Sequence, residues 1–527
     1  MAASQHEIEQ VIADQAAVLR CPGVLSVRPG YEITDGWLTG RPAIVVTMRA
    51  KLASPPAGQQ LPDQLGGIAV DVRQASVVKR LSLEDPEAYL EEHRLNPDTG
   101  AVPEFATERV MVAQKSARST APQSSATAAV AKPQLPYSGP PGSSLRQVTG
   151  QMTLHLSASP DTGWPTLKAF LGDVASTLTV GMYDFTSAHI LSWLSTSLLG
   201  KQLRLVLDHP PKNPTADQTD EATIAGLRTA LGGQLKPSWA LTRLDKLASA
   251  WIYPTSYHIK VAVRDSKVFW LSSGNWNNSN QPDITPATTP ADAEAARHDD
   301  RDWHVIVEHP GLAATFEKYL INDLTIAGQH NTAPVGTPTP LPPPVPGQNR
   351  TPAFGQFFPI KTITGRITVK PLLTPDPGVY AKAVLDLINK AKTSLYLQFQ
   401  YITLPSKPDP AAAPFLKLVH AVIARQLAGV EVKLIMSEYE TAGYLEQLQA
   451  LGLDVVNSVK IQNNVHNKGI VADGSSVLIS SQNWSTDGTL FNRDAGLIIH
   501  HPDAAQYYQA IFLHDWDHLA QQKVQPD

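Results

Sequence analysis

Two segments of the chain carry the same residues at the same spacing, and no other feature limits the fold as strongly. Counted from His258 and from His466, seven positions match, in the form H-x-K-x4-D-x6-S-S-x-N-W. The surrounding segments match in the same order: 177–185 with 393–401, 203–210 with 430–439, 257–277 with 465–485, and 301–310 with 493–502. Internal similarity of this kind predicts two similar structural units in one chain.

Each repeat alternates short runs of β-branched and apolar residues with helical segments. The segments 177–185 and 393–401 are strand-like, whereas 166–177 and 380–392 are helix-like. This alternation is typical of an α/β layered sheet. We therefore predict an α/β fold with two lobes related by an internal pseudo-twofold repeat, together with a small N-terminal α+β module.

Composition divides the chain at two stretches. Residues 115–149, rich in Ser, Ala and Pro, predict a flexible linker, and residues 328–355, which contain TPTPLPPPVPGQ, predict a stiff Pro-rich linker. The predicted units are therefore an N-terminal module (1–114), a first lobe (150–327) and a second lobe (356–527). A length of 527 residues agrees with three or four folding units, at about 150 residues per domain.

The spacing of the repeated motif predicts how its side chains lie. In a strand, residues two apart point to the same face, so His258 with Lys260, and His466 with Lys468, present an imidazole and an ammonium side by side. Each strand is then expected to turn and return, so that the far end of the hairpin delivers an asparagine. The expected turns are at Asp265–Ser266 and Asp473–Gly474, and the asparagines are Asn275 and Asn483.

These side chains suit cleavage of a phosphodiester bond. The reaction requires a nucleophile, an acid for the leaving oxygen, and positive or hydrogen-donating groups around the non-bridging oxygens. The predicted catalytic set is His258, Lys260, Asn275, His466, Lys468 and Asn483. Because the lysines supply the charge stabilisation that metal ions supply elsewhere, we expect neither a metal ion nor a cofactor.

Other residues are expected to support this set. A nucleophilic histidine must be neutral and oriented, usually by a carboxylate on its far nitrogen. Asp302 follows His258, and Asp494 follows His466, so we expect each carboxylate to orient the histidine of its own repeat. The first repeat also has an inserted loop at 278–299, which we expect to be mobile. The remaining supporting residues are Asp265 and Asp473, expected to cap a turn, Ser273 and Ser481, and Trp276 and Trp484, expected in the core or the site wall.

With its Ser-Ser-x-Asn endings, the repeated motif resembles the paired HKD motifs of the phospholipase D superfamily, over about residues 150–520. Ser272–Ser273 and Ser480–Ser481 stand where that family commonly has Gly-Ser. The resemblance implies a site at the interface of two lobes and a covalent phosphohistidine that water or an alcohol resolves. It further implies that His258 is the nucleophile and His466 the general acid and later base, with the lysines and asparagines binding phosphate.

The sequence leaves three readings of the substrate open. A formal net charge of −5 gives no basic surplus for a polyanion, which favours phospholipid head-group hydrolysis, with transfer to an alcohol as a side activity. A nucleic acid substrate is the alternative, because the Asn-Trp endings resemble nuclease members of the superfamily. The third reading, a non-catalytic effector or binding protein, is disfavoured because both motifs are complete.

Two histidine clusters are weighed as metal sites, and a metal role is disfavoured for both. His298-Asp299-Asp300 and His500-His501 have no partners at recognisable ligand spacing.

The remaining predictions concern location and partners. Cys21 is the single cysteine, so no intramolecular disulfide forms. Neither a signal peptide nor an apolar run of about 18 residues is seen, so we expect a cytoplasmic protein, although export without a cleaved signal would leave the same sequence. Residues 1–114 carry no cluster of catalytic residue types, and we expect them to regulate, target or bind a protein partner. We expect catalysis by a monomer.

Overall fold

The protein is described here by a computed structural model. It describes residues 3, 5–34, 37–49, 60–75, 137–208, 217–244, 248–251, 256–297, 299–329, 354–405, 409–437, 442–462 and 464–521. The predicted linker segments 115–136 and 330–353 and the histidine at 298 lie outside the described residues.

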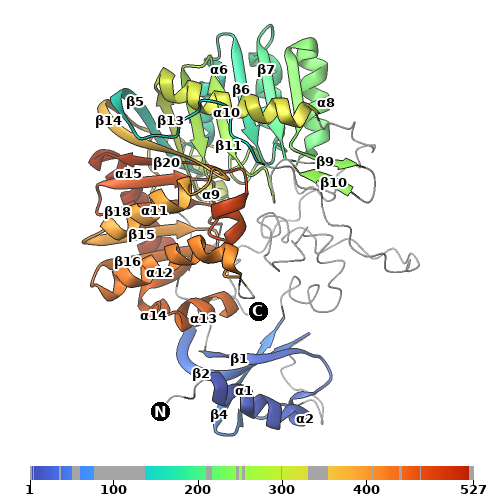
Figure 1. The fold of residues 1–527 in the computed structure, drawn as a ribbon, viewed down its shortest axis with the longest axis vertical. Helices are drawn as coiled ribbons and strands as arrows, with labels where there is room; N and C mark the ends of the chain where they lie inside the picture. The colour runs from blue at the N-terminus through green and yellow to red at the C-terminus, as the bar shows by residue number, and fades with distance from the viewer. Residues whose placement is uncertain are drawn as a thin grey trace.

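One fourteen-stranded sheet runs through both lobes (Figure 1). Its order is β17-β16-β15-β18-β19-β20-β14-β5-β13-β12-β11-β6-β7-β8, with β14 and β5 paired antiparallel at the centre. Outward from that pair, the strands of the two lobes follow in the same order of their repeats. The predicted α/β fold with two repeat-related lobes is therefore confirmed.

The first lobe contributes β5 (Val148–Ser159), β6 (Thr177–Met182), β7 (Gln202–Leu207), β8 (Leu235–Trp239), β11 (Lys260–Arg264), β12 (Val268–Ser272) and β13 (Asp302–Glu308). The second contributes β14 (Lys361–Leu373), β15 (Ser394–Phe399), β16 (Glu431–Ser437), β17 (Val459–Gln462), β18 (Lys468–Ala472), β19 (Ser476–Ser480) and β20 (Ala495–His500). A separate hairpin of the first lobe consists of β9 (Leu241–Leu244) and β10 (Ala248–Trp251).

Helices cover both faces of the sheet. Those of the first lobe are α6 (Gly163–Gly172), α7 (Ala188–Ser197), α8 (Asp220–Leu231), η2 (Gly232–Gln234), η3 (Pro290–Asp292), α9 (Ala293–Ala296) and α10 (Pro310–Gln329). Those of the second are α11 (Val379–Lys390), η4 (Pro410–Ala412), α12 (Ala413–Leu427), α13 (Ala442–Ala450), α14 (Val455–Ser458), η5 (Asp487–Phe491), α15 (Pro502–His514) and η6 (Asp515–Leu519). Within the described ranges, no helix combines the length and apolar character needed to cross a membrane.

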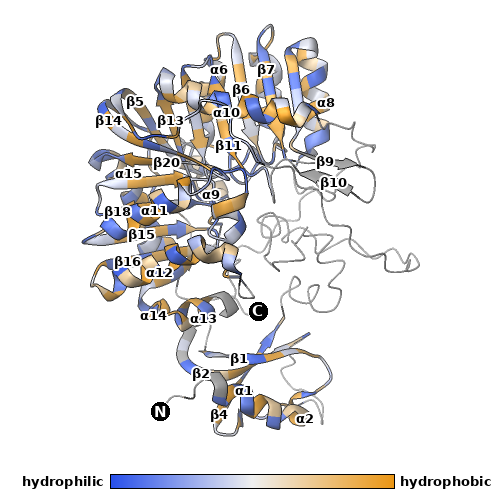
Figure 2. Ribbon diagram, in the orientation of Figure 1, coloured by the Kyte–Doolittle hydropathy of each residue, from blue (hydrophilic) through white to orange (hydrophobic). Residues whose placement is uncertain are grey.

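The two lobes share one hydrophobic core. A buried cluster that includes α10 and α15 extends across both lobes, while each lobe has a second cluster on the opposite face of its sheet. Strand β13 shows the division, because Val305 and Val307 belong to the shared cluster and Ile306 to the first lobe's own cluster. This alternation follows from the two-residue period of a strand, and Figure 2 shows the apolar residues along the strands.

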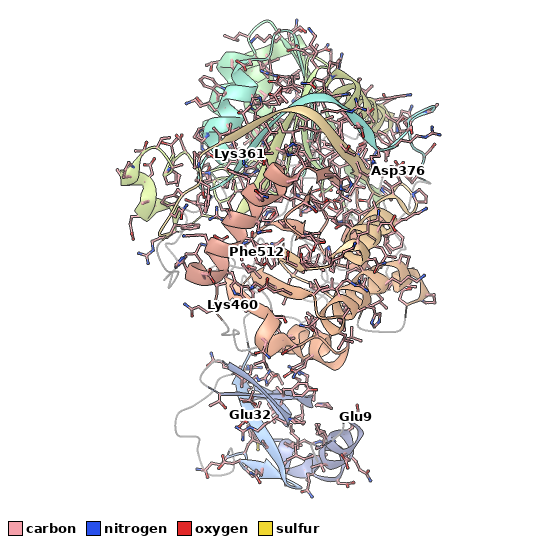
Figure 3. The ribbon with its side chains drawn as sticks, turned by 90° about the vertical axis from the view of Figure 1, so that its left-hand side faces the viewer. Glu9, Glu32, Lys361, Asp376, Lys460 and Phe512 are labelled. Atoms are coloured by element: carbon pink, nitrogen blue, oxygen red, sulfur yellow. The ribbon has the colours of Figure 1, made fainter. Side chains whose placement is uncertain are left out.

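The N-terminal module is a small α+β unit, as predicted. It contains α1 (Gln5–Asp14), α2 (Ala16–Leu19), β1 (Val24–Thr34), β2 (Trp37–Met48), β3 (Gln64–Leu65) and β4 (Ile68–Gln74), with sheet order β1-β2-β4-β3. Its sheet lies beside α13 of the second lobe (Figures 1 and 3). The buried Glu446 of α13 accepts hydrogen bonds from the backbone N–H of Tyr31 (3.0 Å) and from Arg73 (3.1 Å), and pairs with Arg28. A buried carboxylate thus fixes the module to the second lobe.

Two segments differ from the prediction. Residues 137–149, expected to be part of a flexible linker, pack against the lobes: Leu145 joins the shared core and β5 begins at Val148. The inserted loop at 278–299, expected to be mobile, is organised where it is described. Within the loop, the Asp292 carboxylate accepts a hydrogen bond from the Thr285 N–H (2.7 Å). The Trp164 indole N–H of α6 donates a hydrogen bond to Asp283 of the loop (2.8 Å). Composition alone did not reveal these contacts, because they depend on residues distant in sequence.

Candidate active site

Two hairpins carry the repeated motif. Lys260 begins β11, which pairs antiparallel with β12, and Lys468 begins β18, which pairs with β19. The turns lie where they were predicted. Asp265 and Ser266 have φ of 52° and 54°, and Asp473 and Gly474 have φ of 53° and 57°. Positive φ at both central residues is the type I′ geometry that matches the twist of a hairpin.

The motif aspartates hold the start of the neighbouring strand. Asp265 accepts hydrogen bonds from the N–H groups of residues 175–177 at 2.7–2.9 Å, and Asp473 accepts from those of residues 392–394 at 2.8–3.1 Å. Burial alone would raise the pKa of Asp265, but the hydrogen bonds from Ala175, Thr177 and Ser176 lower it to about 2. Both carboxylates therefore lie in the expected turns, but their hydrogen bonds hold the neighbouring strand rather than cap the turn.

Each histidine of the predicted catalytic set is oriented by an aspartate of the other lobe. His258 Nδ1 lies 2.9 Å from Asp494 Oδ1, and His466 Nδ1 lies 3.0 Å from Asp302 Oδ1. The expectation that each aspartate serves its own repeat is therefore wrong. The reason is the central β5·β14 pair, which joins the two halves at the strands next to β13 and β20 and so brings each aspartate to the opposite hairpin. Each of these two His–Asp pairs therefore takes its histidine from one lobe and its aspartate from the other.

The repeated serines hold these aspartates in turn. Ser273 Oγ donates to Asp302 Oδ1 (2.6 Å) and accepts from the Trp303 N–H (3.0 Å). Ser481 Oγ likewise donates to Asp494 Oδ1 and accepts from the Ala495 N–H (3.0 Å). Burial would raise the pKa of Asp302, but the charges of His466 and Lys468 hold it below its ordinary value. Asp302 is thus an anion placed to orient a histidine.

The lysines and asparagines complete a buried polar site. Lys260 Nζ donates to the His258 carbonyl (2.8 Å), and Lys468 Nζ lies 3.0 Å from His466 Nε2. All six residues of the predicted catalytic set are at most 3% exposed. Neither amide atom of the buried Asn483 has a hydrogen-bond partner among the described residues. Because buried polar groups are normally paired, Asn483 has capacity for a ligand.

The tryptophans that end the motif belong to the cores. Trp276 packs edge-on against Phe185 with ring centres 5.1 Å apart, and Trp484 stacks on Phe399 at 4.5 Å. Both are essentially inaccessible to solvent. They anchor the hairpin ends that carry Asn275 and Asn483.

Two buried arginines that precede the aspartates were not predicted to have a role. Arg301 pairs with Asp161 (2.6 Å) and with Asp515 of the second lobe (2.9 Å). Arg493 pairs with Asp323 of the first lobe, through two hydrogen bonds of 2.7 and 2.9 Å. The aligned segments 301–310 and 493–502 both begin with Arg-Asp, so the repeat held the signal.

The backbones of these arginines brace the histidine segments of the opposite lobe. The Arg301 N–H donates to the Asn464 carbonyl (2.7 Å), and the Arg493 N–H donates to the Ser256 carbonyl (2.8 Å). Asn464 and Ser256 each lie two residues before a histidine of the site. An Arg-Asp pair therefore holds both the backbone and the ring of the opposite histidine.

The two halves of the site differ at the ends of β6 and β15. Tyr183 follows β6, and its ring meets the His258 ring edge-on at 4.8 Å, while Lys260 Nζ lies 5.1 Å from its centre. Gln400 follows β15 and donates its N–H to the Asn467 carbonyl (2.9 Å). The repeat could not reveal these neighbours, because their residue types differ.

The described residues contain no group of three or more histidines, cysteines, aspartates or glutamates that could hold a metal ion. Of the two histidine clusters considered, one contains the histidine at 298, outside the described residues. In the other, His500 contacts Ser476 at the end of its strand (2.9 Å).

Comparisons with known proteins found a match to a family model and similar solved structures. Residues 384–516, within the second lobe, match the family model of the PLD-like domain of cardiolipin synthase. No curated protein matches the chain significantly. Similar solved structures include phosphatidylserine synthase from Haemophilus influenzae Rd KW20 (12% identity, 70% of this chain and 88% of that chain, TM-score 0.45). Another is Nuc, a phospholipase D family member from Salmonella typhimurium (20% identity, 31% and 99%, TM-score 0.24).

Proposed function

The chain belongs to the phospholipase D superfamily, which acts on phosphodiester bonds, and we propose that it is a metal-independent phosphodiesterase that forms a covalent phosphohistidine. The observation that carries the proposal is the pair of crossed His–Asp contacts at 2.9 and 3.0 Å. A carboxylate on Nδ1 fixes the tautomer and leaves Nε2 for chemistry. Two such histidines supply the nucleophile and the acid that the reaction needs.

In the proposed mechanism, His258 Nε2 attacks phosphorus and forms a P–N bond. The P–O bond to the leaving alcohol breaks as His466 donates its proton to that oxygen. A water molecule then gives a proton to His466 and attacks phosphorus, and the P–N bond breaks. An alcohol in place of water would give transfer rather than hydrolysis.

The buried cations and amides are proposed to hold the phosphate. Lys260 and Lys468 would balance the charge of the non-bridging oxygens, and Asn275 and Asn483 would donate hydrogen bonds to them. In a site shielded from solvent these interactions are stronger than in water. Because the lysines supply the positive charge, we expect turnover to persist in EDTA.

We propose a phospholipid as the substrate, with hydrolysis of the head-group phosphodiester as the main reaction. The matched family model describes a domain of a phospholipid-synthesising enzyme, and the net charge of −5 offers no general attraction for a polyanion. Residues 1–114 are proposed to have a regulatory, targeting or partner-binding role.

The test is turnover, in EDTA, of mixed phosphatidylcholine and phosphatidylglycerol vesicles beside single- and double-stranded DNA and RNA. His258→Ala and His466→Ala serve as controls, and each should abolish turnover. Cleavage of nucleic acid without lipid turnover would replace the proposed substrate by the nuclease alternative. Full activity in either histidine variant would refute the shared site.

A further inference from the structure

Each of the two buried arginines of the site has an aromatic ring against it from a segment that leads into a lobe. The guanidinium carbon of Arg493 lies 5.4 Å from the centre of the Tyr137 ring, and that of Arg301 lies 4.9 Å from the centre of the Phe354 ring. Both aromatics come from segments that precede the first strand of a lobe. A guanidinium over an aromatic face is held by electrostatic attraction to the ring. The pseudo-twofold repeat therefore extends into the two predicted linkers.

Tyr137 is the more strongly connected of the two. Its hydroxyl donates to Asp376 Oδ2 (2.5 Å) and accepts from Arg493 Nη1 (3.3 Å). Asp376 lies just beyond β14, at the opposite end of the strand from Lys361 (Figure 3). Burial, together with the Asp376 carboxylate, raises the pKa of Tyr137, so the hydroxyl keeps the proton that it donates. The ring of Tyr319 lies 5.3 Å from the same guanidinium.

A short chain of contacts leads from this tyrosine to His258. Arg493 donates to the Thr374 carbonyl (3.0 Å), and the next residue, Asp494, donates its N–H to Thr374 Oγ1 (3.2 Å). The side chain of Asp494 then meets His258 Nδ1. Arg493 and Asp494 are consecutive and both bond to Thr374, so the guanidinium and the carboxylate that orients the histidine are tied to the same residue.

We propose that Tyr137 is a positioning residue for His258, acting through Arg493 and Asp494, and that Phe354 acts in the same way on His466 through Arg301 and Asp302. The segments that lead into the lobes therefore do more than connect them. Each contains an aromatic residue that sets one half of the site. The kinetic consequence rests on the proposed function, whereas the orientation of the two histidines does not.

The test uses the full chain with selectively 15N-labelled histidine. An imidazole N–H bonded to a buried carboxylate gives a proton signal far downfield, so each His–Asp pair reports on itself. His258→Ala and His466→Ala assign the two signals. Tyr137→Ala should shift or broaden the His258 signal and leave that of His466, and Phe354→Ala should do the reverse. Tyr137→Phe, which keeps the ring, should perturb the His258 signal less than Tyr137→Ala.

Turnover of whichever phosphodiester the wild-type protein cleaves provides the second measurement. Tyr137→Ala should lower kcat by about 10- to 100-fold with little change in KM, because a misplaced reacting group affects the chemical step. Thermal melting separates positioning from folding. Equal perturbation of both signals with a lower Tm, or unchanged signals in folded Tyr137→Ala, would overturn the inference. If no substrate is turned over, the proposed function fails and the two proton signals still decide the positioning role.

Discussion

Replacement of Asp494 by asparagine tests the crossed arrangement directly. Asn has nearly the same shape as Asp but lacks the negative charge. Asp494 Oδ1 lies 2.9 Å from His258 Nδ1, and both side chains are inaccessible to solvent. We therefore expect the change to remove one buried, charge-assisted hydrogen bond without leaving a cavity.

The expected loss of activity follows from the strength of that bond. A hydrogen bond to a charged group contributes about 1.5–3 kcal/mol. Since 1.36 kcal/mol corresponds to a factor of ten in rate, kcat should fall by about 10- to 150-fold. The loss is larger if the asparagine amide also donates to Nδ1, because the imidazole then adopts the opposite tautomer.

The assay combines steady-state kinetics with the downfield histidine proton signals. Asp494→Asn should remove the signal that is missing in His258→Ala, although the two residues belong to different lobes. Asp302→Asn is the matched control and should remove the signal that is missing in His466→Ala. If Asp302→Asn instead removes the His258 signal, each aspartate serves its own repeat and the crossed arrangement is refuted.

Three further predictions concern the surroundings of the site. Gly274→Ala should strongly reduce kcat, because an added Cβ would lie 2.5 Å from Asp302 Oδ2. Gly365→Ala is the control, since an added Cβ there meets no atom within 4 Å, and its kcat should be nearly that of the wild type. Asp265→Asn should lower the Tm at pH 7, as measured by melting curves. The difference in Tm should disappear as the pH falls from about 4 through about 2, because the Asp265 carboxylate has a lowered pKa and stabilises the fold only while it is ionised. Glu446→Ala should destabilise the docking of the N-terminal module by about 1.5–3 kcal/mol, because it removes a buried carboxylate that accepts from Arg73 and the Tyr31 N–H, while Arg73 keeps its ion pair with Asp71. Limited proteolysis should then cleave residues 1–75 faster while kcat is retained, and unchanged proteolysis would contradict the docking contact.

The hairpins of the site could be predicted from the sequence because their signals are local. Positions two apart in a strand share a face, and Asp265–Ser266 and Asp473–Gly474 are typical of tight turns. The repeated offsets of the motif also predicted two lobes. These features depend on residues close together in the chain.

The pairing of His258 with Asp494 could not be predicted in the same way. Aligning the repeats places Asp302 and Asp494 at equivalent positions but does not say which histidine each one meets, because that depends on how β5 and β14 pair. The aromatic contact of Tyr137 was hidden for a related reason, since Pro- and Ser-rich composition predicts a linker whether or not a single side chain within it packs.

The crossed His–Asp pairs also bear on how such a chain can be inherited and recombined. A lobe exchanged with one from a related protein would bring a histidine that must fit a foreign aspartate and an aspartate that must fit a foreign histidine. We expect a substitution near Asp494 to require a matching change near His258, more than two hundred residues earlier in the chain. Although the sequence contains two copies of one motif, an exchange boundary placed between the lobes would separate residues that are in direct contact in the site.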